Sequence, residues 1–139
     1  WTEYIILIMK AFISLVLVIF SFTENQEISD MQTVMQLSID LKELQPYFHN
    51  STRPLVIELN KHVDYDVELT KFGLPVELKS KAEIFVENKK SFISFRQLSM
   101  NNAKAQVSFI YSGRGVLVDL ELMKIGNDWI IDHSNLTEK

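Results

Sequence analysis

Apolar residues follow three different patterns along this chain. Residues 4–22 are almost continuously apolar, and the exceptions are Lys10 and two serines. Between residues 28 and 44, apolar side chains recur every three or four positions, and from residue 91 onward they alternate with polar ones. The patterns predict a hydrophobic N-terminal segment, then an amphipathic helix, then a series of half-buried β-strands.

An amphipathic helix is expected after the hydrophobic segment. Ser29 followed by Gln32 has the spacing of an N-terminal capping box. Pro46 marks the other end, because the residue before a proline avoids helical geometry. The helix would have about 16–18 residues. Its apolar stripe comprises Ile28, Met31, Val34, Leu37, Leu41 and Leu44.

Alternating apolar and polar residues predict a meander of four antiparallel strands near the end of the chain. The strands run from Phe92 to Met100, from Ala105 to Ser112, from Val116 to Leu122 and onward from Trp129, with turns at 101–102, 113–115 and 126–128. An extended segment is also expected at Leu55–Leu59. Residues 81–87 fit either a strand or a helical turn.

These elements predict an α+β domain in which one N-terminal helix packs on a curved antiparallel sheet of four or more strands. In this register the Trp129 ring faces the helix stripe. Several apolar residues would then lie on the outer face of the sheet, where a partner would cover them. They are Ile93, Ile110, Leu117, Met123 and Ile130.

The hydrophobic segment has the organisation of an export signal. Met9-Lys10 forms a short basic start, and Ala11–Phe22 an apolar core of about a dozen residues. Residues 4–22 together nearly reach the ~30 Å thickness of a bilayer core, so a retained anchor is the alternative. Lys10 inside a membrane helix would cost about 2.5–3.5 kcal/mol, which favours a removable signal.

Two domains follow from this interpretation. Residues 1–22 are expected to be a signal peptide or membrane anchor, and residues 23–139 a single α+β domain. The protein would be exported to the periplasm or cell envelope, or secreted. It would touch a membrane through residues 4–22 if they are not cleaved.

Composition narrows the class of protein. The chain has no cysteine, so an exported domain must be stabilised by packing, which suits a bacterial envelope better than a disulfide-rich secreted scaffold. The net charge of −4 is spread along the chain, without the basic stripe that nucleic-acid binding needs. No cofactor or metal is predicted.

The closing strands resemble a known pattern. Tyr111-x-x-x-Gly115, then Val116–Leu122, then Lys124-x-Gly126-Asn127-x-Trp129-x-Ile131 is similar to the end of nuclear-transport-factor-2-like and cystatin-like domains. The resemblance implies a curved antiparallel sheet wrapped around an N-terminal helix over residues 28–139, as in small exported bacterial proteins of uncharacterised function. No catalytic residue is carried over from it, because the matching motif holds none.

His62, Asp64 and Asp66 alternate along the chain. On a strand all three would point to one face and could bind a metal, but a solvated polar turn explains them more simply.

Tyr47 and His49 follow the helix, where related folds open a pocket. Together with an aspartate such as Asp119 or Asp132 they could do acid–base work. Packing of an aromatic residue at the helix end is the simpler explanation.

Export and the lack of a catalytic constellation favour a binding or interaction module that is not an enzyme. Its partner surface would be Ile93, Ile110, Leu117 and Ile130, and it could form a homodimer through the sheet. One alternative is a small-molecule pocket protein or weak enzyme with Tyr47, His49 and Tyr111 around a cavity of about 300 Å³ or more. Another is a membrane-anchored envelope protein.

Overall fold

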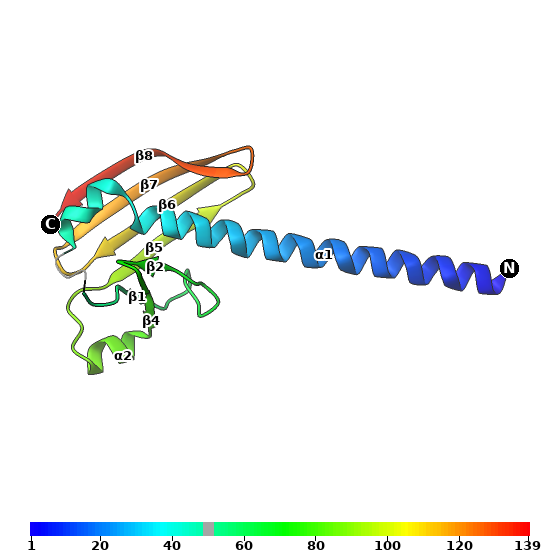
Figure 1. The fold of residues 1–139 in the computed structure, drawn as a ribbon, viewed down its shortest axis with the longest axis horizontal. Coiled ribbons are helices and arrows are strands. Elements are labelled where there is room, and N and C mark those ends of the chain that lie inside the picture. The colour runs from blue at the N-terminus through cyan, green and yellow to red at the C-terminus, as the bar shows by residue number, and fades with distance from the viewer. Residues whose placement is uncertain (49–51) are drawn as a thin grey trace. The chain divides into compact units, whose positions relative to one another are not determined.

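The computed structural model describes residues 1–48 and 52–139, without the side chains at positions 17 and 19–25. The chain divides into two units, Trp1–Met31 and Gln32–Lys139. The helix α1 (Thr2–Ile39) begins in the first unit and ends in the second (Figure 1). The predicted helix start at Ser29 is therefore wrong, since α1 is already helical for more than six turns before that residue.

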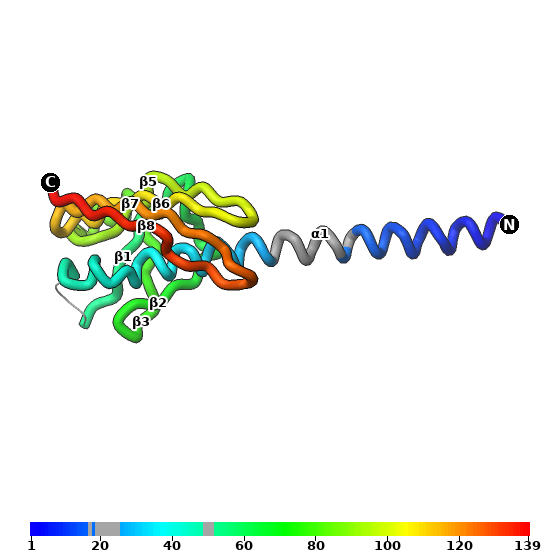
Figure 2. Tube along the Cα trace, turned by 90° about the horizontal axis from the view of Figure 1, so that it is seen from above, coloured from blue at the N-terminus to red at the C-terminus, as the bar shows by residue number. Residues whose placement is uncertain are grey.

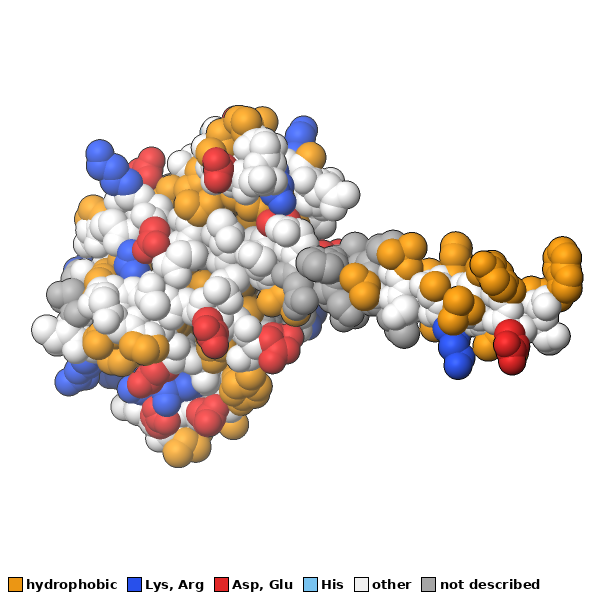
Figure 3. Space-filling view, turned by 45° about the vertical axis from the view of Figure 1, so that its right-hand side comes forward, with side chains coloured by type: hydrophobic (Ala, Val, Ile, Leu, Met, Phe, Trp, Pro, Cys, Tyr) orange, Lys and Arg blue, Asp and Glu red, His pale blue; other side chains and the backbone are white. Residues whose placement is uncertain are grey.

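Within the first unit, α1 exposes apolar side chains at consecutive positions. Each residue from Ile5 to Met9 is at least 49% exposed, and five consecutive residues turn once around the helix axis, so apolar side chains point in every direction. Figure 3 shows apolar side chains on one face of this part of α1. A helix without a polar face lacks the single stripe that packs on a globular core. In the part of the chain that the structure describes, no helix is long and apolar enough to span a membrane.

The end of α1 differs from the sequence expectation. The α-helix stops at Ile39, and a 3₁₀ helix, η1 (Lys42–Tyr47), follows with Pro46 inside it. The tighter turn keeps Leu41 and Leu44 on one side, where both are buried. The Gln45 side chain donates hydrogen bonds to the carbonyl oxygens of Ile39 (3.3 Å) and Leu41 (2.7 Å), which satisfies acceptors that the helix end leaves free.

The second unit contains a six-stranded sheet with the strand order β4-β1-β5-β6-β7-β8. Its larger part is the antiparallel meander that the alternation predicts, which is confirmed. The four strands are β5 (Ile93–Met100), β6 (Lys104–Tyr111), β7 (Val116–Ile125) and β8 (Asp128–Glu138).

Two short strands make the sheet mixed, so the expectation of a wholly antiparallel sheet is wrong. β1 (Val56–Glu58) pairs in parallel with both β4 (Glu77–Lys79) and β5. Parallel neighbours need a long crossover. The crossovers here hold the hairpin of β2 (Thr70–Lys71) and β3 (Leu74–Pro75), and the helix α2 (Lys81–Val86).

One face of the sheet and the end of α1 form the core. Figure 2 shows η1 and the last turns of α1 on one side of β5–β8. Trp129 is 5% exposed and lies two residues before Ile131, which pairs with the buried Leu122. The predicted inward orientation of Trp129 is confirmed. The core also includes Val34, Met35, Ile39, Phe95, Val107, Phe109, Val118 and Leu120.

Two polar side chains of α1 and that of Asp40, the residue after it, pair with the backbone or side chains of the crossover. Gln32 accepts a hydrogen bond from the Glu68 amide, and Gln36 both accepts from the Thr70 amide (3.0 Å) and donates to the Thr70 carbonyl (2.8 Å). Asp40 then binds Lys71. Residues 32, 36 and 40 are four apart and share one helix face. Their side chains therefore form a row of hydrogen-bonding partners for residues 68–71.

Gln36→Ala should release Thr70 from the helix. Both hydrogen bonds to Thr70 are lost, together with the one that Gln36 donates to Asp40 at 2.7 Å. Each has a net contribution of about 0.5–1.5 kcal/mol, and the higher helix propensity of alanine offsets a few tenths. We expect hydrogen exchange at the Thr70 amide to accelerate about tenfold. Gln26→Ala is the matched control, since Gln26 bonds to Asp30 on the same helix. Unchanged exchange at Thr70 would contradict the role of Gln36.

Candidate functional site

A pocket of about 460 Å³ lies beside the end of β6. The described lining residues come from six separate chain segments: the end of η1, the start of β1, the β2–β3 turn, the start of β4, the loop after α2 and the end of β6. We call it the Phe48 pocket. The described lining residues are Phe48, Arg53, Pro54, Leu55, Val56, Phe72, Glu77, Glu87, Asn88, Lys89, Lys90, Ser91 and Tyr111.

Three aromatic rings form the apolar wall of the Phe48 pocket. Phe48 contacts Phe72 and Tyr111 edge-on, with ring centroids 5.5 Å and 5.1 Å apart. Phe72 takes a positive φ of 57° in the β2–β3 turn, and Gly73 follows at 72°. Such a backbone is unusual for a phenylalanine. This backbone conformation lets Phe72, which is far from Phe48 and Tyr111 in sequence, reach the same wall.

A buried lysine ties this wall to the end of α1. The Lys71 ammonium lies 5.3 Å from the Phe48 centroid and 5.5 Å from the Phe72 centroid, within the range of cation–π contact. It also forms an ion pair with Asp40 at 2.8 Å. The Lys71 side chain is 7% exposed, so its position is set by these partners rather than by solvent.

The rim on the other side is the loop after α2. A capping box begins this helix: the Ser80 hydroxyl accepts from the Glu83 amide, and the Glu83 carboxylate accepts from the Ser80 amide at 2.7 Å. The bonds from the Ser80 amide and hydroxyl lower the pKa of Glu83. At the other end Asn88 takes a φ of 51°, and the amide of Lys89 donates to the Ile84 carbonyl, as in a Schellman motif.

The rim loop is fastened to the end of β6. The Ser112 hydroxyl accepts from the Phe92 amide (3.0 Å) and donates to the Lys90 carbonyl (2.9 Å). Next to it, a Cβ atom at Gly113 would lie 2.5 Å from the Ser91 hydroxyl oxygen and 3.2 Å from the Tyr111 ring. Only glycine therefore allows this close approach, which holds the rim and the wall at a fixed separation.

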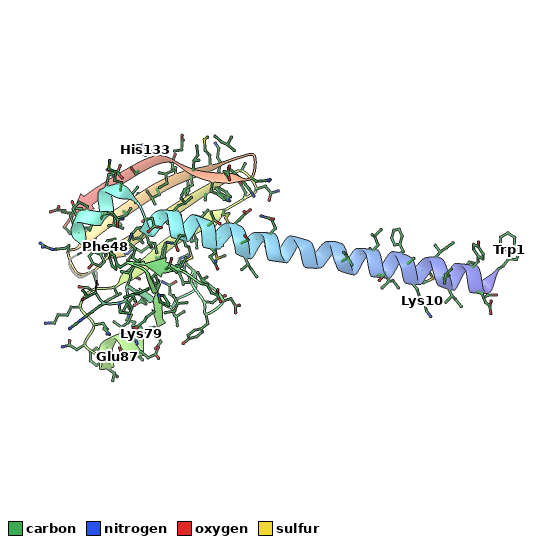
Figure 4. The ribbon with its side chains drawn as sticks, viewed as in Figure 1. Trp1, Lys10, Phe48, Lys79, Glu87 and His133 are labelled. Carbon is green, nitrogen blue, oxygen red and sulfur yellow. The ribbon has the colours of Figure 1, made fainter. Side chains whose placement is uncertain are left out.

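The carboxylates around the Phe48 pocket are paired with lysines. Lys79 binds Glu87 at 3.0 Å and Glu77 at 3.5 Å, and Lys89 lies 3.8 Å from Glu87. The hydrogen bond that Lys79 donates to the Glu87 carboxylate is the main reason why the pKa of Lys79 is raised. Figure 4 shows Lys79 and Glu87 side by side near α2. Both lining carboxylates are thus engaged by lysines.

The two predicted tyrosines lie in different surroundings. Tyr111 is buried and lines the Phe48 pocket. The hydroxyl of Tyr47 donates to the Glu138 carboxylate at 2.7 Å, a bond that raises the pKa of Tyr47, and Tyr47 is not among the described lining residues. His49 lies outside the residues that the structure describes. The prediction that these three residues bind a ligand together stays a prediction.

The predicted partner surface is interrupted. Ile110 and Leu117 face each other on the outer side of the sheet, and Ile130 pairs with Met123 at the other end of the strands. Two polar rows separate these apolar spots, Gln97–Ser108–Asp119–Asn135 and Ser99–Gln106–Glu121–His133. Figure 4 places His133 on β8, away from Phe48.

Ile93 does not belong to that outer surface. It is fully buried and pairs with Tyr111 on the inner face. Strict alternation counted back from Met100 would turn Ile93 outward. A β-bulge between Phe95 and Gln97 adds one residue to β5 and reverses the faces before it. The outward placement of Ile93 is therefore wrong.

The alternating residues His62, Asp64 and Asp66 do not form a strand. Asp64 accepts a hydrogen bond from the Asp66 amide, and Asn60 accepts one from the His62 amide, as in tight polar turns. Among the described residues, no group of three or more His, Cys, Asp or Glu side chains could hold a metal ion.

Sequence reasoning missed most of the pocket. Phe48, Phe72, Arg53 and Lys90 carry no local signal, since none of them belongs to a periodic pattern or to a motif that indicates a site. The one available hint was the turn Phe72–Pro75. It indicates a reversal of the chain but not which elements the reversal approaches.

No protein-family model, curated protein or solved structure matches this chain. The similarity to nuclear-transport-factor-2-like and cystatin-like domains stays a prediction.

Proposed function

We propose that residues 32–139 form a non-catalytic binding domain that holds a small, partly apolar molecule in the Phe48 pocket. The observation that supports this best is the pocket itself, a concavity of about 460 Å³ with an aromatic wall. This volume lies in the range of small-molecule sites, which combine apolar walls with a few polar groups. Edge-to-face rings present a surface on which a flat apolar group can stack.

The fixed geometry of the wall and rim also favours binding. The Lys71–Asp40 ion pair holds one side and Ser112 holds the other. A site that is already shaped loses less conformational entropy when a ligand arrives. Both carboxylates of the described lining, Glu77 and Glu87, are held in ion pairs with lysines, whereas a general base must be positioned against the reacting group. This supports binding rather than catalysis.

Ser91→Phe should block the pocket, because a phenyl ring would project from the rim toward the aromatic wall. We expect the wild-type full chain to bind 4-phenylbutan-1-ol, a neutral probe with one aromatic ring, and the variant to bind it at least tenfold more weakly. Titration calorimetry measures both. Thr137→Phe adds the same ring on the outer face of β8 and serves as the control. Equal binding by all three proteins would locate the probe elsewhere.

Export is proposed for the N-terminal segment, as a removable signal or a retained envelope anchor. The consecutive exposed apolar residues Ile5 to Met9 support this, because such a helix is poorly suited to water. Cell fractionation separates the two forms. A shortened soluble product indicates a removed signal, a full-length product in the membrane fraction indicates an anchor, and a full-length soluble product would contradict both.

A homodimer through the outer face of the sheet is a second proposal, supported by half-buried Ile110 and Leu117 and by exposed Ile130. Light scattering at high micromolar concentration tests it, and a monomer would remove it.

A further inference from the structure

We infer that the ligand of the Phe48 pocket is an amphipathic anion, with an apolar body and one carboxylate. The inference rests on the proposed function of the pocket and adds the chemical class of the ligand. The charge of the residues at the rim indicates the carboxylate, and the apolar wall does not bear on it.

Positive charge is in excess around the pocket. The described lining residues include the cations Arg53, Lys89 and Lys90 against the carboxylates Glu77 and Glu87. Lys79, which stands behind the lining, binds both of these carboxylates, and Lys89 lies within 4 Å of one of them. The two negative charges are therefore each paired with a lysine at the rim, which weakens their repulsion of an incoming anion.

Two of the lining cations are unpaired within the described part of the chain. Arg53 and Lys90 form no ion pair with the residues that the structure describes. They reach the pocket from different segments, since Arg53 precedes β1 and Lys90 lies in the loop after α2. A carboxylate between them could accept from the planar guanidinium and from the ammonium at once, in bonds about twice as strong as neutral ones.

The backbone of Lys90 is also held in place. Its carbonyl accepts from Ser112, whose hydroxyl in turn accepts from Phe92. The Lys90 side chain therefore extends from a backbone position that is fixed next to the apolar wall. A ligand with its charge at one end and its apolar group at the other would satisfy the rim and the wall together.

Three probes of one shape test the inference on the full chain: 4-phenylbutyrate, 4-phenylbutan-1-ol and 4-phenylbutan-1-amine. We expect the anion to bind about tenfold more tightly than the alcohol, the equivalent of one charge-assisted hydrogen bond, and the cation to bind least. The advantage of the anion should shrink in 0.5 M salt, because the rim is exposed to solvent.

The double variant Arg53→Gln, Lys90→Gln should bring the anion and alcohol affinities within about twofold, mainly because the affinity for the anion falls. The matched control Arg96→Gln, Lys104→Gln removes the same charges from exposed positions on β5 and β6 and should keep the preference.

The possible failures are distinguishable. If no probe binds the wild type, the proposed function of the pocket is wrong. If anion and alcohol bind equally well, the pocket binds ligands but the inferred anionic class is wrong. A preference that survives in the Arg53, Lys90 variant would also overturn the inference.

Discussion

Trp129→Ala should leave the domain severely destabilised, with a loss of about 3–5 kcal/mol in the free energy of unfolding. The ring is 5% exposed on the inner face of β8, and Lys124 lies 5.7 Å from its centroid. Its indole nitrogen has no hydrogen-bond partner among the described residues, so the loss is one of packing and of the cation contact. Domains of this size have about 5–15 kcal/mol in total.

Glu121→Ala is the matched control for Trp129. Glu121 is exposed on the outer face of the neighbouring strand, opposite His133. Removing it should change stability by about 0.5 kcal/mol or less. Urea melts of the two variants give the answer. Similar midpoints would mean that the ring contributes little to the core.

Asp40→Asn should destabilise the domain more than Lys71→Met, although both break the same ion pair. Asp40→Asn leaves the ammonium of Lys71 in a site where the side chain is 7% exposed, without its charged partner. Breaking a fully buried pair in this way costs about 3–5 kcal/mol. Asp40 is 48% exposed, so water compensates for part of the loss, and we expect about 2 kcal/mol.

Lys71→Met removes the buried charge and keeps an unbranched apolar side chain beside Phe48 and Phe72. Sulfur packs well against aromatic rings, so we expect a loss of about 1 kcal/mol or less. The double variant Asp40→Asn, Lys71→Met should be no less stable than Asp40→Asn alone. Thermal or urea unfolding measures all three, and a larger loss for Lys71→Met than for Asp40→Asn would contradict this account of the site.

The elements predicted best were those whose signal lies in neighbouring residues. The alternation in β5–β8 was sufficient to place four strands, because side chains of a strand point to opposite faces with a period of two. The inward orientation of Trp129 followed from the same rule. No rule of alternation could foresee the bulge in β5, which needs an extra residue and reverses the face of Ile93.

Helix limits were predicted poorly because tertiary contacts decide them. The spacing of Leu41 and Leu44 fits an α-helix and a 3₁₀ helix almost equally well over one turn. The 3₁₀ helix is stabilised after α1 because both leucines are buried and the Gln45 side chain donates hydrogen bonds to backbone carbonyls there. Serine is a common helix-capping residue, but the residues before Ser29 are themselves helical.

The sequence by itself determined the α+β class, the position of a helix before a run of antiparallel strands, and the alternating faces of those strands outside the bulge in β5, since each depends on residues close together in the chain. The parallel pairing of β1 and the Phe48 pocket were decided by the tertiary structure alone. Phe48, Phe72, Lys90 and Tyr111 come from four segments, and the crossover from β1 to β5 brings them together. Long-range contacts of this kind leave no periodic trace in the sequence, because each segment contributes one or a few residues whose partners lie far along the chain.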